Sequence, residues 1–267
     1  MYWWPVMNKN KLQPVNANCI RLIQITDTHI FSDPEEELDG LNTATSLSGV
    51  IEAIAAEEQA DLVVLSGDLV HDPSPSAYAN LSKLLERLTV PVFCLPGNHD
   101  DPGLMQKQLN SGITSTDKEI SIGNWRLILL DDFIPNTHTH AGALGTDELA
   151  FLDNALEQSG PDNVIIFLHH QPVPVLSSWM DGMMLENPED FFSIVDCYSQ
   201  VRCIAWGHVH QEFRSSRAGV SLVGSPSTCI QFKPGSDAYA RDNLDPGYTV
   251  FELSPGGGVE VQVKRVG

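Results

Sequence analysis

Five short segments of this 267-residue chain carry metal-binding side chains, and each follows an apolar run. They are Asp27-Thr28-His29, Gly67-Asp68, Gly97-Asn98-His99-Asp100, His169-His170 and Gly207-His208-Val209-His210. Carboxylate, imidazole and amide oxygen suit Zn, Mn or Fe, and the absence of thiolates from these segments argues against a soft-metal site. Two such cations side by side activate water and hold a phosphate group. Together the segments predict a two-metal site that hydrolyses phosphate esters.

Each segment taken alone has an ordinary structural explanation. An Asp at a strand end is usually part of a turn or a helix cap, and a lone G-N-H-D is usually a turn. In extended backbone, side chains two residues apart leave the same face, so Asp27 and His29 are expected to point together. The spacing leaves open which of His169 and His170 binds metal. The joint occurrence of the five segments, each behind a strand, favours one common site.

The chain must place these segments at the ends of strands. Apolar runs predict strands at about 19–26, 62–65, 92–95, 118–122, 125–130, 164–168 and 201–206. Helices are predicted at about 43–58, from Ser74-Pro75 onward, near 102–109, behind a cap at Thr146, and after Asn187-Pro188. Strands alternate with helices first and stand alone after about residue 213. This order predicts an α/β fold, as a mixed sheet or two packed sheets flanked by helices.

The composition is that of an ordinary globular protein, with 42% hydrophobic and 19% charged residues. No apolar run is long enough to span a bilayer, and the N-terminus shows no secretory signal. Cytoplasm is therefore the expected location, with no membrane partner. Residues 1–18 are expected to form a polar N-terminal extension and residues 19–267 a single domain. Five widely spaced cysteines without a C-x-x-C pair argue against a disulfide framework or zinc knuckle.

The charge balance restricts the class of substrate. Fifteen Lys and Arg against 35 Asp and Glu give a formal net charge of −20. Such a surface repels nucleic acids and anionic membranes at long range, so no nucleic-acid partner is expected. An anionic small-molecule substrate requires a strong local positive charge, and a metal pair supplies one.

From Ile20 through His210, the motifs D-x-H, G-D, G-N-H-D, H-H and G-H-x-H resemble the signature of the calcineurin-like metallophosphoesterases. The resemblance implies a β-sandwich of two mixed sheets flanked by helices, with two divalent metal ions (Fe, Mn or Zn) at the strand ends. It implies that one ion is held by Asp27, His29, Asp68 and His210, and the other by Asp68, Asn98, His169 and His208. Asp68 then bridges the two ions, and His169 is favoured over His170 as the ligand.

A further segment, Gly224–Pro234, narrows the resemblance to the bacterial class III cyclic-AMP phosphodiesterases. The resemblance implies hydrolysis of 3',5'-cyclic AMP to 5'-AMP, by in-line attack of a hydroxide that bridges the metal ions. Substrate contacts are expected from His29, Asp68, Asn98, His99, His170 and His210, and segment 224–234 is expected to wall the nucleotide pocket. Gln171, where relatives often carry His or Pro, is expected to alter the pocket rim.

His99 is the candidate catalytic residue, either protonating the leaving oxygen or holding a phosphate oxygen. Asp72 or Asp100 is hypothesised to orient it. Two alternatives remain: a phosphodiesterase for another small substrate, such as a glycerophosphodiester or a nucleotide pyrophosphate, and a non-catalytic scaffold of the same fold. A scaffold is expected to have lost ligands or His99, and this chain retains them. A nuclease is disfavoured by the charge, and an oligomer is compatible with the sequence.

Overall fold

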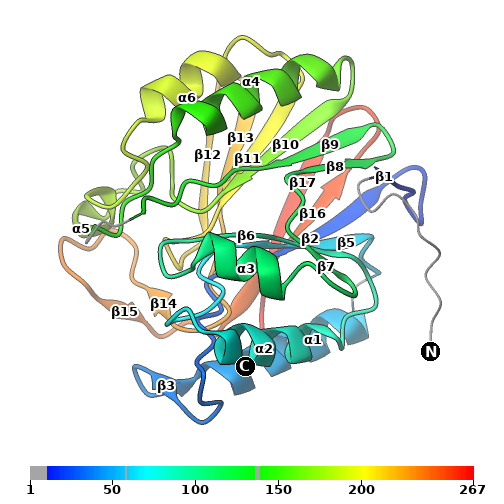
Figure 1. Cartoon of the computed structure of the whole chain (residues 1–267). Helices are drawn as coiled ribbons and strands as arrows, with labels where there is room; N and C mark the ends of the chain where they lie inside the picture. Colours follow the sequence, from blue (N-terminus) through cyan, green and yellow to red (C-terminus); the bar gives the residue numbers. More distant parts are fainter. Residues whose placement is uncertain (1–10, 58, 136–138) are drawn as a thin grey trace.

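The computed structural model describes residues 11–57, 59–135 and 139–267. Two sheets pack face to face between layers of helices (Figure 1). The six-stranded sheet has the order β17-β16-β2-β5-β6-β7 and the seven-stranded sheet the order β1-β8-β9-β10-β11-β13-β12. This architecture confirms the predicted α/β sandwich of two mixed sheets.

The strand bounds agree with the apolar runs to within about two residues. The six-stranded sheet contains β2 (Ile20–Ile25), β5 (Leu62–Ser66), β6 (Val92–Leu95), β7 (Thr114–Ser115), β16 (Gly247–Leu253) and β17 (Val259–Arg265). The seven-stranded sheet contains β1 (Lys11–Leu12), β8 (Glu119–Ile122), β9 (Trp125–Leu129), β10 (Asn163–Leu168), β11 (Val201–Trp206), β12 (Phe213–Arg217) and β13 (Val220–Gly224). Two short hairpins add β3 (Glu37–Leu38) with β4 (Leu41–Asn42), and β14 (Gln231–Phe232) with β15 (Arg241–Asp242).

Parallel strands form the centre of each sheet. In one sheet β2, β5, β6 and β7 run parallel, and in the other β9, β10, β11 and β13 do so. Antiparallel strands β16 and β17 extend the first sheet, and β8 and β12 pair antiparallel in the second. Because parallel strands end at the same edge of a sheet, the segments that follow β2, β5 and β6 meet there, as do those after β10 and β11.

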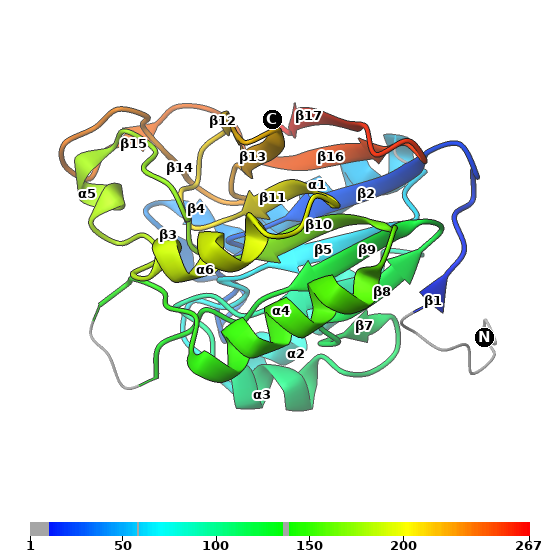
Figure 2. The same cartoon turned by 90° about the horizontal axis from the view of Figure 1, so that it is seen from above.

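Helices cover the outer face of each sheet. α1 (Thr43–Glu57), α2 (Pro75–Leu85) and α3 (Pro102–Gln108) lie on the six-stranded side, and α4 (Thr146–Ser159) and α6 (Pro188–Val195) on the seven-stranded side (Figure 2). The Ser74 side chain caps α2 by accepting the Ala77 N–H at 3.1 Å. The predicted Thr146 cap was wrong: Gly145 is the N-cap residue and Thr146 already lies in the helix. The short helix α5 (Ser178–Asp181) was not predicted.

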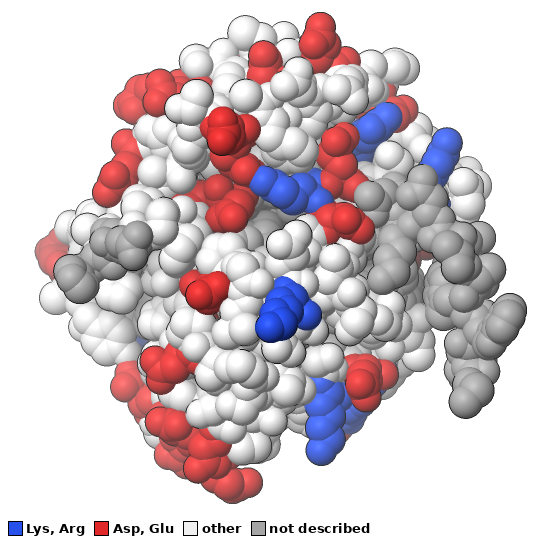
Figure 3. Space-filling view, viewed as in Figure 1, with Lys and Arg blue, Asp and Glu red and all other residues white. Residues whose placement is uncertain are grey.

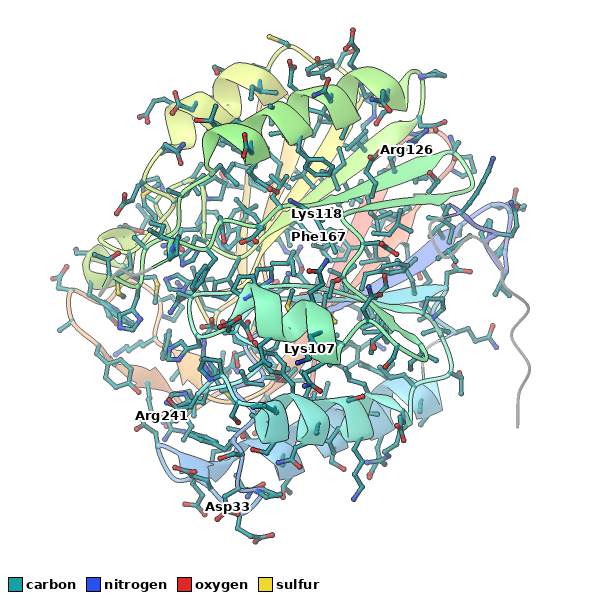
Figure 4. The ribbon with its side chains drawn as sticks, viewed as in Figure 1. Asp33, Lys107, Lys118, Arg126, Phe167 and Arg241 are labelled. Atoms are coloured by element: carbon teal, nitrogen blue, oxygen red, sulfur yellow. The ribbon has the colours of Figure 1, made fainter. Side chains whose placement is uncertain are left out.

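Three hydrophobic clusters hold the layers together. In β5, Val63 and Leu65 pack against the helices while Leu62 and Val64 face the other sheet, as alternation along a strand requires. Phe167 of β10, labelled in Figure 4, belongs to this inter-sheet cluster. A polar residue also joins the sheets, because the Gln24 amide donates to Ser66 Oγ of the same sheet and to the Trp206 carbonyl of the other.

The part of the predicted extension that the structure describes includes β1, which pairs in parallel with β8. Residues 1–10 of the extension and residue 58 of the first predicted helix lie outside the described residues. Within residues 11–57, 59–135 and 139–267, no helix combines the length and the apolar character needed to cross a bilayer.

Candidate metal centre

Seven candidate ligands come together at the carboxyl ends of five strands. Asp27 and His29 follow β2, Asp68 follows β5, Asn98 follows β6, His169 follows β10, and His208 and His210 follow β11. Their side chains approach to 3.2 Å from His210 Nε2 to Asp27 Oδ1, 3.3 Å from His210 Nε2 to His29 Nε2, and 3.4 Å from His169 Nε2 to Asp68 Oδ1. All seven are buried except Asn98, which is half-buried.

The backbone of Asp27, His29, His208 and His210 is not extended, contrary to the expectation for Asp27 and His29. Their φ angles are +53°, +44°, +61° and +45°, and that of Asp68 is +49°. The left-handed region is unfavourable for non-glycine residues and persists only where the surrounding structure enforces it. Each pair therefore converges on the site through tight left-handed turns, not through the alternation of a strand.

Glycines allow the segments to approach one another closely. A Cβ at Gly67 would overlap the His169 ring, and one at Gly97 would overlap the backbone nitrogen and Oδ1 of Asp68. Gly67 also has a φ of +94°, which supports the bend expected at the exit of β5.

Gly97→Ala is expected to weaken Mn²⁺ binding roughly tenfold or more, because the new methyl group displaces the Asp68 carboxylate. Calorimetric titration of the metal-free chain measures this affinity. Gly145→Ala is the matched control, since a Cβ there meets open space. Equal affinities of the Gly97→Ala and Gly145→Ala chains would contradict the close packing around Asp68.

Backbone carbonyls fix the orientation of two histidines. Nδ1 of His169 lies 2.9 Å from the Ser66 carbonyl oxygen, and Nδ1 of His210 lies 2.8 Å from that of Ile230. A carbonyl only accepts, so in each ring Nδ1 carries the proton and donates it. Nε2 of each ring is then left to bind a cation, which is the usual outer-shell arrangement of metal-binding histidines.

Three buried polar atoms at the centre have no hydrogen-bond partner in the described structure: Asn98 Oδ1, His169 Nε2 and His208 Nε2. Leaving a buried donor or acceptor unpaired costs about 1–3 kcal/mol, so three such atoms in one place indicate a missing partner. These atoms, with an Asp68 oxygen, are the ligands that the family resemblance implies for one ion. The residues present therefore fit a divalent metal ion.

A thiol lies at the other end of the centre. Cys229 Sγ and one ring nitrogen each of His29 and His210 lie within 4.8 Å of one another, and all three residues are buried. The sequence argument against a soft-metal site counted only the five motif segments and missed this sulfur. That argument does not hold, because Cys229 belongs to segment 224–234, whose place beside the metal ligands appears only in the fold.

The electrostatics of the centre are dominated by burial and by ligand pairs. Burial alone raises the pKa of a carboxyl, but His169 and His99 hold the pKa of Asp68 well below its usual range. Burial alone lowers the pKa of an imidazole, but the Asp68 carboxylate raises the pKa of His169 to about 10. Burial holds the pKa of His29 and of His208 well below the ordinary value. Burial alone also lowers the pKa of His210, but the Asp27 carboxylate raises it well above the ordinary value, so His169 and His210 hold protons that a bound cation would displace.

Comparison with known proteins identifies the fold family. Residues 20–212 match the calcineurin-like phosphoesterase family. The chain belongs to this family. It is 37% identical over 261 residues to the 3',5'-cyclic adenosine monophosphate phosphodiesterase CpdA of Pseudomonas aeruginosa, covering 97% of this chain and 95% of that protein. It is also 36% identical over 248 residues to a 3',5'-cyclic-nucleotide phosphodiesterase of Nostoc, covering 92% of each.

The fold of this calcineurin-like phosphoesterase is found in much more distant proteins. A dimetal phosphatase from Danio rerio superimposes with a TM-score of 0.62 at 18% identity, over 93% of this chain and 99% of that one. At this identity the likeness concerns the fold alone.

His99 lies beside the phosphoesterase centre within a group of imidazoles. Its backbone N–H donates to Asp68 Oδ1 at 2.8 Å, and its Nδ1 donates to the His71 carbonyl at 2.9 Å. The ring stacks between those of His71 and His140, with centroids 4.8 and 5.7 Å away. Neither of these two histidines was found from the sequence, since neither lies in a recognised motif.

The hypothesis that Asp72 or Asp100 orients His99 was wrong. The Asp100 carboxylate accepts hydrogen bonds from the backbone of Leu69, Val70 and Gly97 and from the Tyr78 hydroxyl, so its role is to brace the strand exits. No hydrogen bond between described residues joins Asp72 to His99. The backbone carbonyl that follows β5 orients the ring instead.

His170 lies within the centre, since one ring nitrogen each of His169, His170 and His208 lie within 4.8 Å of one another, whereas Gln171 is held away by α5. His170 Nδ1 lies 3.0 Å from Asp132 Oδ1 and its Nε2 lies 3.0 Å from the His140 carbonyl, so both ring nitrogens have neighbours. Gln171 is completely buried and donates to the Met180 carbonyl at 2.9 Å. Its side chain anchors α5, and the expected effect of Gln171 on the pocket rim stays a prediction.

Segment 224–234 braces the first ligand loop. The Ser227 hydroxyl donates to the Asp27 carbonyl at 2.8 Å, and the Thr228 backbone N–H donates to the Thr26 carbonyl at 3.1 Å. Gln231 closes the segment by donating to the Ser227 carbonyl at 2.8 Å. These bonds hold Cys229 and the Ile230 carbonyl next to His210.

Proposed function

We propose that this chain is a binuclear metal-dependent phosphodiesterase that hydrolyses 3',5'-cyclic AMP to 5'-AMP. The observation that carries the reaction class is the meeting of Asp27, Asp68 and His169, whose ligand atoms lie within 4.8 Å of one another, beside buried imidazole and amide atoms without hydrogen-bond partners. The substrate is supported by similarity over nearly the whole chain to two proteins named as cyclic-nucleotide phosphodiesterases.

The proposed ligands divide into two sets that share one carboxylate. One ion is held by Asp27, His29, Asp68 and His210, and the other by Asp68, Asn98, His169 and His208. The ions are Fe, Mn or Zn, which these oxygen and nitrogen ligands suit. When bound, two such ions lower the pKa of a water molecule and neutralise charge on the phosphate.

A residue of this chain then delivers the proton that the leaving 3' oxygen requires. Hydrolysis forms a bond from phosphorus to the water oxygen and breaks the bond to the 3' oxygen of the ribose. Because His99 Nδ1 donates to the His71 carbonyl, Nε2 is the nitrogen left to deliver a proton to the leaving 3' oxygen. The phosphate lies against His29, Asp68, Asn98, His99, His170 and His210.

Residues 19–267 are proposed to act as one domain behind an N-terminal extension of residues 1–18. The inter-sheet cluster supports this proposal, since it joins residues from Ile20 to Leu253.

A cytoplasmic location is proposed on the five free cysteines, which suit a reducing compartment. Figure 3 shows acidic side chains spread over this face of the molecule and fewer basic ones. Such a surface repels a nucleic acid more strongly than it repels a small substrate.

Chain loaded separately with Mn, Fe and Zn is expected to convert cyclic AMP to 5'-AMP. Comparing kcat/KM for cyclic AMP, cyclic GMP and glycerophosphodiesters tests the substrate. A glycerophosphodiester turned over with a tenfold higher kcat/KM would make that compound class the substrate. Full metal loading without turnover of any phosphodiester would favour the scaffold instead.

A further inference from the structure

Three aromatic rings gather beside the metal centre, on segments that the five motifs do not include. The Phe232 ring stacks on that of the candidate ligand His210, with centroids 4.2 Å apart and an interplanar angle of 11°. Trp179 and Tyr239 meet Phe232 edge to face at 5.1 and 5.5 Å, and they meet each other at 5.5 Å. We call Trp179, Phe232 and Tyr239 the aromatic cluster.

The cluster reaches from the buried centre to the surface. His210 is buried, Phe232 and Trp179 are half-buried, and Tyr239 is 52% exposed. Tyr239 is a half-exposed ring at the end of a row of rings that begins at the metal-binding residue His210. It therefore offers apolar area to a small molecule that is already held at the metals. Such area is the usual lining of small-molecule sites, where a few polar groups fix orientation.

Hydrogen bonds from three distant segments hold the rings in place. The Tyr239 hydroxyl donates to the Asp39 carboxylate, and Arg241 of β15 donates to the Asp39 carbonyl. These bonds tie the β14–β15 hairpin to the turn between β3 and β4. Figure 4 labels Arg241 on this hairpin and Asp33 on the loop that leads to β3.

The helix that carries Trp179 is fixed to the same hairpin. The Ser178 hydroxyl donates to Asp237 at 2.7 Å, and the Gly235 N–H donates to Ser177 Oγ at 3.0 Å. Gln171 holds the other side of α5 through the Met180 carbonyl. In both Figure 1 and Figure 2, α5 lies beside β14 and β15. The rings are thus pre-organised, which reduces the ordering cost of binding.

We propose that the aromatic cluster is the stacking platform for the nucleobase of a cyclic nucleotide whose phosphate lies at the metal centre. This inference rests on the proposed function and assigns residues to the base. One ribose separates the phosphate from the base, so a base reaches only a short distance beyond the ligands, and the cluster begins in contact with His210. A neutral, flat base suits this place better than a second anion, because Asp39 and Asp237 lie next to the rings.

The test removes the ring from the protein and the base from the substrate. Cyclic AMP is compared with its abasic analogue, 1-deoxyribofuranose 3',5'-cyclic phosphate, in the wild-type chain and in Tyr239→Leu and Trp179→Leu. Stacking of a base on an aromatic side chain predicts a fall of roughly 5- to 100-fold in the ratio of the two kcat/KM values, mainly through KM for cyclic AMP. Tyr198→Leu is the control: it makes the same change on the far side of the seven-stranded sheet, where the hydroxyl donates to Asp153.

Four results would overturn the platform. The first is an unchanged ratio in both variants, and the second is a wild-type chain that turns over both substrates equally well. The third is an equal loss on both substrates, which would mean that the rings only support His210. The fourth is an unchanged ratio with dissociation of a dimer in sedimentation, which would make the cluster an interface between two copies of this chain.

If the wild-type chain shows no turnover, binding of the product 5'-AMP still tests whether the aromatic cluster binds a base. Wild-type chain that hydrolyses neither substrate would contradict the proposed function. Calorimetric binding of 5'-AMP and of ribose 5-phosphate then tests the platform separately. Preferential binding of 5'-AMP that is lost in Tyr239→Leu supports it, and equal binding of the two compounds contradicts it.

Discussion

Asp68→Ala is expected to lose bound metal and phosphodiesterase activity together. The Asp68 carboxylate faces His169 at 3.4 Å through one oxygen and His29 at 3.7 Å through the other. Residues from both proposed ligand sets therefore meet at this one side chain. Its removal takes a ligand from both ions and leaves buried imidazoles without their negative partner, so cyclic AMP turnover should fall by at least about a thousandfold.

Metal content by elemental analysis and kcat for cyclic AMP measure the two losses on the same sample. Asp61→Ala is the matched control, because Asp61 is a buried carboxylate at the opposite end of β5 that accepts the backbone N–H groups of Val15 and Arg21. It should lower stability and leave two ions per chain. An Asp68→Ala chain that retains two ions would contradict the bridging role.

His99→Ala is expected to keep both metals and to lower kcat for cyclic AMP by roughly 10²- to 10⁴-fold. The family motif assigns no metal to this side chain, and the hydrogen bond from Nδ1 to the His71 carbonyl leaves Nε2 to carry a proton. Its loss removes the proton donor for the 3' oxygen of the ribose, a poor leaving group. Elemental analysis and steady-state kinetics on cyclic AMP give the two measurements.

A substrate with a better leaving group distinguishes proton donation by His99 from a merely structural role of this residue. p-Nitrophenolate leaves with little need of a proton, so bis(p-nitrophenyl) phosphate should lose much less activity than cyclic AMP in the variant. Equal losses on both substrates would show that His99 does not deliver the proton. Loss of metal from His99→Ala would instead place it among the ligands.

The sheet architecture was largely predictable because buried parallel strands leave continuous apolar runs in the sequence. Leu62–Leu65 and Val164–Leu168 are such runs, and both form strands of the buried kind. The short helix α5 was missed because four residues carry no helical periodicity. The cap of α4 was misplaced by one residue because Thr146 is a common cap residue, whereas Gly145 takes that position here.

The metal ligands were found from their types and their places behind strands, but their geometry was not. Left-handed φ angles at Asp27 and His29 follow from tertiary contacts that no local propensity encodes. His169 differs from His170 in its approach to Asp68 and in its hydrogen bond to the Ser66 carbonyl, and both partners follow or belong to another strand. Cys229 reaches the site because its segment packs on the loop that follows β2.

A metal titration of the metal-free chain distinguishes two ion sites from one. Cyclic AMP hydrolysis is measured while Mn²⁺ is added in known amounts to chain freed of metal by a chelator. With two ligand sets that share Asp68, we expect no turnover at the start and a rise that levels off at two ions per chain. Turnover by the metal-free chain, or a plateau at one ion per chain, would contradict it.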